Sequence, residues 1–182
     1  IQNIYAFCRY GDDLGDDAPF SDEIRWKLLD AWEQDLSEAA RDDWSGNPRH
    51  PILKAIQATA REKGIPRQPF WKWIQAFKMD QTKKRYADFD ELRRYCFYSA
   101  DPVGHLFLYV YGHDDEELRA LSDWTCTALQ LANHWQDVAR DLDQDRIYLP
   151  ADTMTRHGYS YDDYLSRTAD DRWCALLADE VA

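Results

Sequence analysis

The feature that most constrains the fold of this chain is the spacing of its apolar residues. They recur every three or four positions along almost the whole sequence. This period matches one face of an α-helix, whereas a half-buried strand alternates every two residues. The stretch from Leu106 to Val110 is the only candidate strand, and it lies inside a helical pattern. The sequence therefore predicts an all-α fold.

Proline and glycine residues divide this pattern into separate helices. We expect Gly64 to end one helix in the left-handed conformation, and we expect Pro102 and Gly104 to bend another. The expected helices span 4 to near 19, 24 to a break at 44–48, 51–63, 69–79, 89–111 and 115–141, with a further helix beginning near Tyr161.

Length and charge limit the classes of function. The 182 residues, 45% of them hydrophobic, are enough to bury a core, and a single domain is expected. A net charge of −12, from 34 acidic and 22 basic residues, argues against a non-specific nucleic-acid surface, which needs clustered Lys and Arg.

Cysteine and apolar content indicate the compartment. Cys8, Cys96, Cys126 and Cys174 lie far apart and form no C-x-x-C pair, which favours reduced thiols and a cytosolic location. No apolar run approaches the roughly 20 residues needed to cross a bilayer. Ile1 opens directly into an apolar-periodic segment, so we expect a soluble chain with a shortened N-terminus.

Two aspartate clusters carry the candidate chemistry. The first reads Arg-Tyr-Gly-Asp-Asp-Leu-Gly-Asp-Asp over residues 9–17, and on a helix Asp12 and Asp16 lie one turn apart. The second contains Asn133, Asp137 and Asp141, which form a ladder of oxygen ligands at four-residue spacing.

Both clusters conflict with the rules of helix stability. Like charges four residues apart repel, and acidic groups near a helix C-terminus oppose its dipole by roughly 0.3–1 kcal/mol each. One such cluster in an acidic chain is more often a solvated face. Two clusters, each at a helix end, favour a site for a divalent cation, and oxygen-only ligands select Mg²⁺ or Mn²⁺.

The two clusters resemble the aspartate-rich motifs of the squalene/phytoene synthase family. Residues 5–16 are similar to the first motif, and residues 130–141 followed by Arg-Ile-Tyr-Leu-Pro at 146–150 are similar to the second. Between them, residues 95–104 resemble the family segment that ends in Val-Gly. The resemblance covers essentially the whole chain. Family members are longer at both ends, so residues 1–182 are expected to be a partial domain, truncated at both ends.

The resemblance implies a single-domain isoprenoid synthase, a helical bundle whose central cavity holds a prenyl diphosphate and Mg²⁺. It makes Asp12, Asp16, Asp137 and Asp141 the expected catalytic carboxylates. The expected metal ligands are Asp12, Asp13, Asp16, Asn133, Asp137 and Asp141. The expected substrate contacts are Tyr5, Arg9, Gln130, Asn133 and Arg146. Aromatic rings near the motifs, at Tyr5, Phe107 and Trp135, could stabilise a carbocation or simply pack in the core.

One departure from the family pattern favours a particular branch. Condensing synthases usually carry Arg directly before the first aspartate of the second motif, whereas this chain has Gln136, as bacterial hydroxysqualene synthases do. The resemblance thus implies a carbon–oxygen lyase that converts presqualene diphosphate to hydroxysqualene for hopanoid synthesis. The basic run Lys83 to Arg85 could replace the missing charge or be a solvated face.

Two alternatives to this reaction stay open. The chain could belong to a prenyltransferase that joins two farnesyl or geranylgeranyl diphosphates, or to a non-catalytic assembly factor. Retention of the strained aspartates argues against the second of these. Peripheral membrane contact and association with pathway enzymes are compatible with the sequence, which does not decide them.

Overall fold

The computed structural model describes residues 1–17 and 20–181, and the side chains of Asp16 and Asp17 lie outside this description. Every regular element of the described residues is helical, which confirms the all-α prediction. The chain forms two compact units, Ile1–Thr82 with Phe97–Cys126, and Lys83–Cys96 with Thr127–Ala182. No described helix is both long and apolar enough to cross a membrane.

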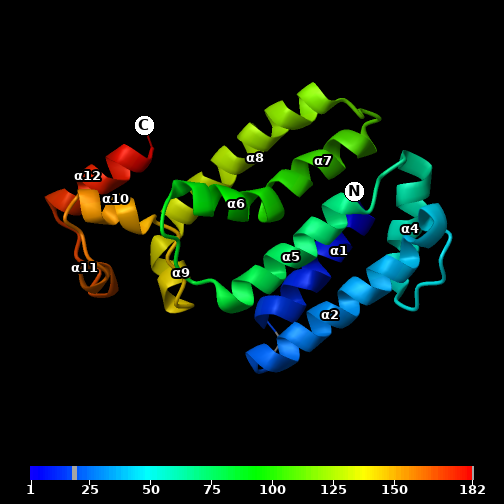
Figure 1. Cartoon of the computed structure of the whole chain (residues 1–182), viewed down its shortest axis with the longest axis horizontal. Coiled ribbons are helices and arrows are strands. Elements are labelled where there is room, and N and C mark those ends of the chain that lie inside the picture. The colour runs from blue at the N-terminus through cyan, green and yellow to red at the C-terminus, as the bar shows by residue number, and fades with distance from the viewer. Residues whose placement is uncertain (18–19, 182) are drawn as a thin grey trace. The chain divides into compact units, whose positions relative to one another are not determined.

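The first unit is organised around helix α5, which packs against α2 and α7, while α1 packs against α4 and α5 (Figure 1). Its core includes Phe7, whose ring lies 5.3 Å from Trp32 and 5.1 Å from Phe70. Its elements are α1 (Gln2–Asp12), η1 (Asp13–Asp17), α2 (Asp22–Ala39), α3 (Arg41–Trp44), α4 (Pro51–Lys63), α5 (Gln68–Thr82) and α7 (Asp101–Val110), with the end of α6 (Phe89–Ser99) and the first part of α8 (Glu116–Gln136).

The helix expected to run from residue 24 to the break at 44–48 ends earlier, at Ala39. After it, the backbone of Asp42, Asp43 and Trp44 turns in the left-handed region, with φ of 48°, 57° and 66°. Aspartate tolerates this region, but tryptophan rarely adopts it. The buried Trp44 side chain donates from Nε1 to the carbonyl of Ile65 at 2.8 Å, and this tertiary bond holds the turn.

Of two further predictions about helix ends, one is confirmed and the other is wrong. Gly64 ends α4 with φ 65° and ψ 29°, the left-handed conformation predicted for it. The expected bent helix over 89–111 is instead two helices, α6 and α7, separated at Ala100. Pro102 lacks the N–H that a continuous helix needs, so it starts a new helix. Gly104 lies within α7, and a Cβ there would lie 2.0 Å from Ser122 Oγ of α8.

The second unit contains the second aspartate motif and a small apolar core that includes Ile147, Leu149 and Met154. Two segments far apart in sequence hold it together: the N–H groups of Ile147 and Ala151 donate to the carbonyls of Lys84 and Tyr86, each at 3.0 Å. Its elements are the first part of α6, the second part of α8, α9 (Val138–Asp143), α10 (Ala151–Arg156), α11 (Tyr161–Leu165) and α12 (Asp171–Glu180).

The predicted start near Tyr161 is confirmed, whereas α10 and α12 were not predicted. The expected helix over 115–141 is interrupted at Asp137, which has φ −94° and ψ 11°.

Candidate active site

The first motif lies where an α-helix changes into a wider turn. Helix α1 ends at Asp12, and Asp13–Asp17 form the π-helix η1 instead of the regular helix expected there. Such turns occur frequently at functional sites. Arg9 contacts both neighbouring carboxylates, Asp12 at 2.8 Å and Asp13 at 2.7 Å. The structure thus brings together Arg9, Asp12 and Asp13, while the side chain of the predicted ligand Asp16 lies outside the described residues.

The glycines between these aspartates fix how the motif packs on α5. A Cβ on Gly11 would lie 2.3 Å from Cε2 of Phe77, so only glycine fits there without a shift of the ring. One turn further, Gln81 donates from Nε2 to the carbonyl of Gly15 at 3.1 Å. The two glycines therefore face the core, and Asp12 and Asp13 keep part of their surface exposed, at 42% and 47% of each side chain.

An apolar groove of about 300 Å³ runs along the same helix. Tyr5 and Cys8 of α1 line it together with Phe107 of α7, so two rings singled out from the sequence share one groove. Burial and the nearby charge of Asp12 raise the pKa of the Cys8 thiol to about 12. Asp12 lies four residues after Cys8 on α1, about one helical turn beyond the residues that line the groove. The third ring, Trp135, packs instead against the core of the second unit.

The second motif keeps its ligand spacing through the interruption at Asp137. The N–H of Asp137 donates to the carbonyl of Asn133 at 2.8 Å, and the N–H of Asp141 donates to that of Asp137 at 2.9 Å. Asn133, Asp137 and Asp141 therefore remain about one turn apart. Arg140, which the sequence analysis did not single out, pairs with Asp137 at 2.7 Å.

Asp141 lies in an environment where a bound cation would stabilise the charged form of its carboxylate. Its side chain is only 13% exposed. Burial and the nearby charge of Asp137 raise its pKa, and Arg140 and Arg146 oppose that rise. A divalent cation would offset the desolvation, and the oxygen-only donor set of Asp141, Asp137 and Asn133 suits Mg²⁺.

Within the described residues no three carboxylate, thiol or imidazole groups converge into a metal site. Each motif is described within its own unit, so each offers a partial ligand set. Asp12 and Asp13 can supply oxygens from the first motif, and Asn133, Asp137 and Asp141 from the second.

The expected substrate contacts fall into two groups. Tyr5 and Arg9 are exposed on α1, beside the groove and at the carboxylates. Asn133 is exposed on α8, whereas Gln130 is half-buried and lies with its Nε2 3.1 Å from His134 Nε2. Arg146 is half-buried and donates to Gln144 Oε1 at 3.1 Å.

The basic run at 83–85 has structural partners within the second unit. Lys83 pairs with Glu91, and Arg85 pairs with Asp145 at 2.5 Å. Both cations therefore tie segments of the unit to each other. This arrangement favours a structural role over replacement of the charge that Gln136 lacks.

Sequence reasoning missed the aromatic support beneath the second motif. The Tyr148 ring lies 3.6 Å from the His134 ring with an interplanar angle of 15°. Tyr86 also stacks on Tyr148, and the Tyr95 ring contacts Tyr148 in a tilted arrangement. The backbone bonds of Ile147 and Ala151 to the 84–86 segment hold Tyr148 in place. One part of this arrangement could have been predicted from the sequence: Gln130 and His134 are four residues apart, so their side chains are neighbours on one helix face.

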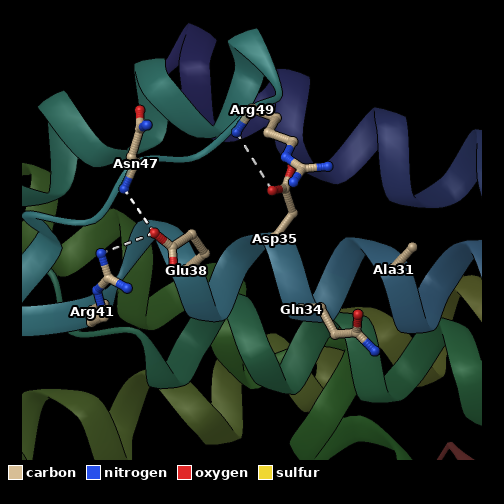
Figure 2. Close-up of a pocket in the computed structure, with 7 residues that line it drawn as sticks. All are labelled: Ala31, Gln34, Asp35, Glu38, Arg41, Asn47 and Arg49. Atoms are coloured by element: carbon tan, nitrogen blue, oxygen red, sulfur yellow. Dashed lines mark hydrogen bonds and ion pairs between the residues drawn. The ribbon is translucent and has the colours of Figure 1, made fainter.

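A second, polar hollow lies on the first unit along α2 (Figure 2). Its carboxylates already have partners in the loop before α4. Glu38 accepts from the N–H of Asn47 at 3.1 Å, and Asp35 accepts from those of Arg49 at 3.5 Å and His50 at 3.3 Å. These contacts fasten the loop to the helix, so the hollow has a structural explanation.

The all-α fold with two aspartate-rich motifs is that of the isoprenoid synthases. The model of the squalene/phytoene synthase family matches residues 1–182, and the chain belongs to this family.

Similar proteins agree with this assignment. A phytoene synthase of an Oncidium hybrid cultivar is 33% identical, and that of Arthrospira platensis is 31% identical, each over 100% of this chain. The chain spans 44% and 61% of the length of those relatives.

Two solved structures have the same fold. Squalene synthase HpnC from Alicyclobacillus acidocaldarius is 42% identical with a TM-score of 0.88, over 98% of this chain and 65% of that one. A dehydrosqualene synthase in complex with ligand is 25% identical with a TM-score of 0.84, over 98% and 60%.

Proposed function

We propose that this chain is the motif-bearing part of a Mg²⁺-dependent isoprenoid synthase that converts presqualene diphosphate to hydroxysqualene. The observation that carries the proposal is the apolar groove beside Asp12, where a hydrocarbon chain can lie with its diphosphate at the carboxylates of the first motif. The catalytic carboxylates are Asp12, Asp16, Asp137 and Asp141, with Asp13 and Asn133 as further oxygen ligands.

The proposed reaction begins with ionisation of the carbon–oxygen bond. The bonding electron pair leaves with the pyrophosphate, and a cyclopropylcarbinyl cation remains. Bound Mg²⁺ would offset the charge that develops on the departing group. Arg9 supports this step, because its guanidinium can pass from Asp12 and Asp13 to the phosphate oxygens once the carboxylates bind cations.

Rearrangement of the cyclopropane then gives an allylic cation, and water adds to it with loss of a proton. The aromatic rings of Tyr5 and Phe107 line the groove and can stabilise the cation through their faces. Tyr5 is 69% exposed and Phe107 is 57% exposed, so both rings are accessible to a bound chain.

A metal-binding experiment tests the first part of the proposal. Mg²⁺ with pyrophosphate should raise the melting temperature of the full-length protein, since the pair binds only the folded state. The double variant Asp12→Asn, Asp137→Asn should show no rise. An equal rise in both proteins would refute the metal assignment.

The choice of reaction rests on the neutral side chain of Gln136, which is exposed beside Asp137. A condensing enzyme must hold two diphosphates, and a positively charged side chain at this position would help to neutralise the second one. Gln136 supplies only the dipole of its amide. The full-length enzyme should therefore form hydroxysqualene from presqualene diphosphate and little product from farnesyl diphosphate alone.

The second candidate is head-to-head condensation of two prenyl diphosphates. It is favoured by the phytoene synthase relatives. It is also favoured by Arg140, three residues after Asp137, because its guanidinium pairs with Asp137 and supplies a positive charge that Gln136 does not. Efficient conversion of farnesyl or geranylgeranyl diphosphate by the purified enzyme, without a partner, would select this candidate.

A further inference from the structure

His134 is a polar residue buried beneath the second motif. Its side chain is 7% exposed, although it lies between the exposed Asn133 and the half-buried Trp135 in sequence. One face of the imidazole stacks on Tyr148, and the Tyr95 ring lies 6.0 Å away at 43°. A buried imidazole requires partners for its two nitrogen atoms, because an unsatisfied polar group is costly in the core.

The first partner fixes which nitrogen carries the proton. Gln130, one turn earlier on α8, has its amide Nε2 3.1 Å from Nε2 of His134. An amide nitrogen only donates, so the histidine Nε2 accepts. The proton of the neutral ring therefore lies on Nδ1.

The protonated nitrogen faces a ligand of the second motif. Nδ1 of His134 lies 4.0 Å from Oδ2 of Asp141. The two atoms would have to come about 1 Å closer to form a hydrogen bond. A neutral N–H group suits this position, because it can orient the carboxylate without cancelling the charge that attracts a cation.

We propose that His134 is a positioning residue for Asp141, holding this carboxylate toward the metal through Nδ1–H while Gln130 fixes the tautomer. The inference rests on the magnesium site of the proposed function. It assigns to His134 a role outside the ligand set itself. The alternative is that His134 only fills space against Tyr148.

A matched pair of variants separates the two roles. His134→Gln and His134→Met have side chains of similar length and shape, and both lose the stack on Tyr148. Only glutamine retains an N–H that can reach Asp141. A packing role predicts the same metal affinity for both, whereas a positioning role predicts a difference.

The measurement is a Mn²⁺ titration of the full-length protein, with free Mn²⁺ followed by electron paramagnetic resonance. The dissociation constant should rise roughly tenfold in His134→Met and stay within about threefold of the wild type in His134→Gln. His157→Met is the control, because it removes a histidine that pairs with Asp179 at 3.0 Å in the same unit and should leave the affinity unchanged.

Each outcome decides a separate question. Equal constants for His134→Met and His134→Gln would overturn the positioning role and leave the magnesium site standing. A wild-type protein that binds no Mn²⁺, with or without pyrophosphate, would overturn both proposals. If thermal unfolding shows that the matched pair is unfolded, His134→Phe, which keeps a ring on Tyr148, decides instead: wild-type affinity there refutes the inference, and tenfold weaker binding supports it.

Discussion

Gly11 lies so close to Phe77 that a β-carbon on it would stand 2.3 Å from Cε2 of the ring. Gly11→Ala should therefore lower the free energy of unfolding by about 1–3 kcal/mol, since the half-buried ring has to move. Urea denaturation measures this. Gly15→Ala is the matched control, because the nearest atom to its Cβ is Gln81 Nε2 at 3.4 Å. Equal losses for the two variants would contradict a specific contact with Phe77.

Asp137→Asn should separate activity from stability. The ion pair of Asp137 with the exposed Arg140 contributes less than about 1 kcal/mol, so the fold should persist. Turnover should fall by more than about 100-fold if the carboxylate holds a cation. The control is Asp143→Asn in α9, the helix that begins directly after Asp137, and this variant loses a similar exposed pair with Arg167 at 2.5 Å. Near-normal product formation by Asp137→Asn would exclude it as a ligand.

Acid should weaken the second unit through Arg172, which pairs with Asp163 at 2.9 Å and with Asp170 at 2.7 Å. Hydrogen bonds from Ser160 and Arg172 hold the pKa of Asp163 well below its usual range, and Arg172 lowers that of Asp170. A depressed carboxylate pKa gives stability that is present above the ordinary value near 3.8 and is lost as pH falls through the folded value.

Arg172→Gln should therefore lower the melting temperature at pH 7 and flatten its decline in acid. Thermal unfolding followed between about pH 2 and pH 7 measures both effects. Parallel pH profiles for the two proteins would show that this cluster does not govern the acid response.

The rate at which Cys8 reacts with a thiol reagent should show how far the groove protects this side chain. With its pKa raised to about 12, Cys8 is almost entirely protonated at pH 8 and should react slowly with iodoacetamide, whereas the exposed Cys174 should react first. Asp12→Asn should speed the labelling of Cys8, because the Asp12 charge contributes to the raised pKa. Mass spectrometry of digested protein gives both rates, and equal labelling of the two thiols would be inconsistent with a protected Cys8.

Local rules were enough to predict much of the fold. Gly64 ends α4 and Pro51 begins it, because each residue has a strong preference for that position. The sequence also placed each aspartate motif at a helix end, where both lie. It placed Tyr5 and Phe107 near the candidate chemistry, and the structure brings them into one groove.

The remaining features depend on contacts that apolar periodicity does not encode. The left-handed turn at Trp44 is held by a bond to Ile65, 21 positions away. The π-helix at Asp13–Asp17 changes backbone hydrogen bonding without changing residue type. The His134 environment comes from Tyr148, which reaches it only because residues 147–151 bond to the 84–86 segment.

The discontinuous second unit has a consequence for the order in which the protein folds. Arg85 and Asp145, which pair within it, are 60 positions apart in sequence. Closing so long a loop costs entropy before the contacts form, and such non-local pairing slows folding. During synthesis, the 84–86 segment leaves the ribosome long before its partner at 147–151 exists. We therefore expect the second motif to acquire its native geometry late, after the helices of the first 82 residues can already pack.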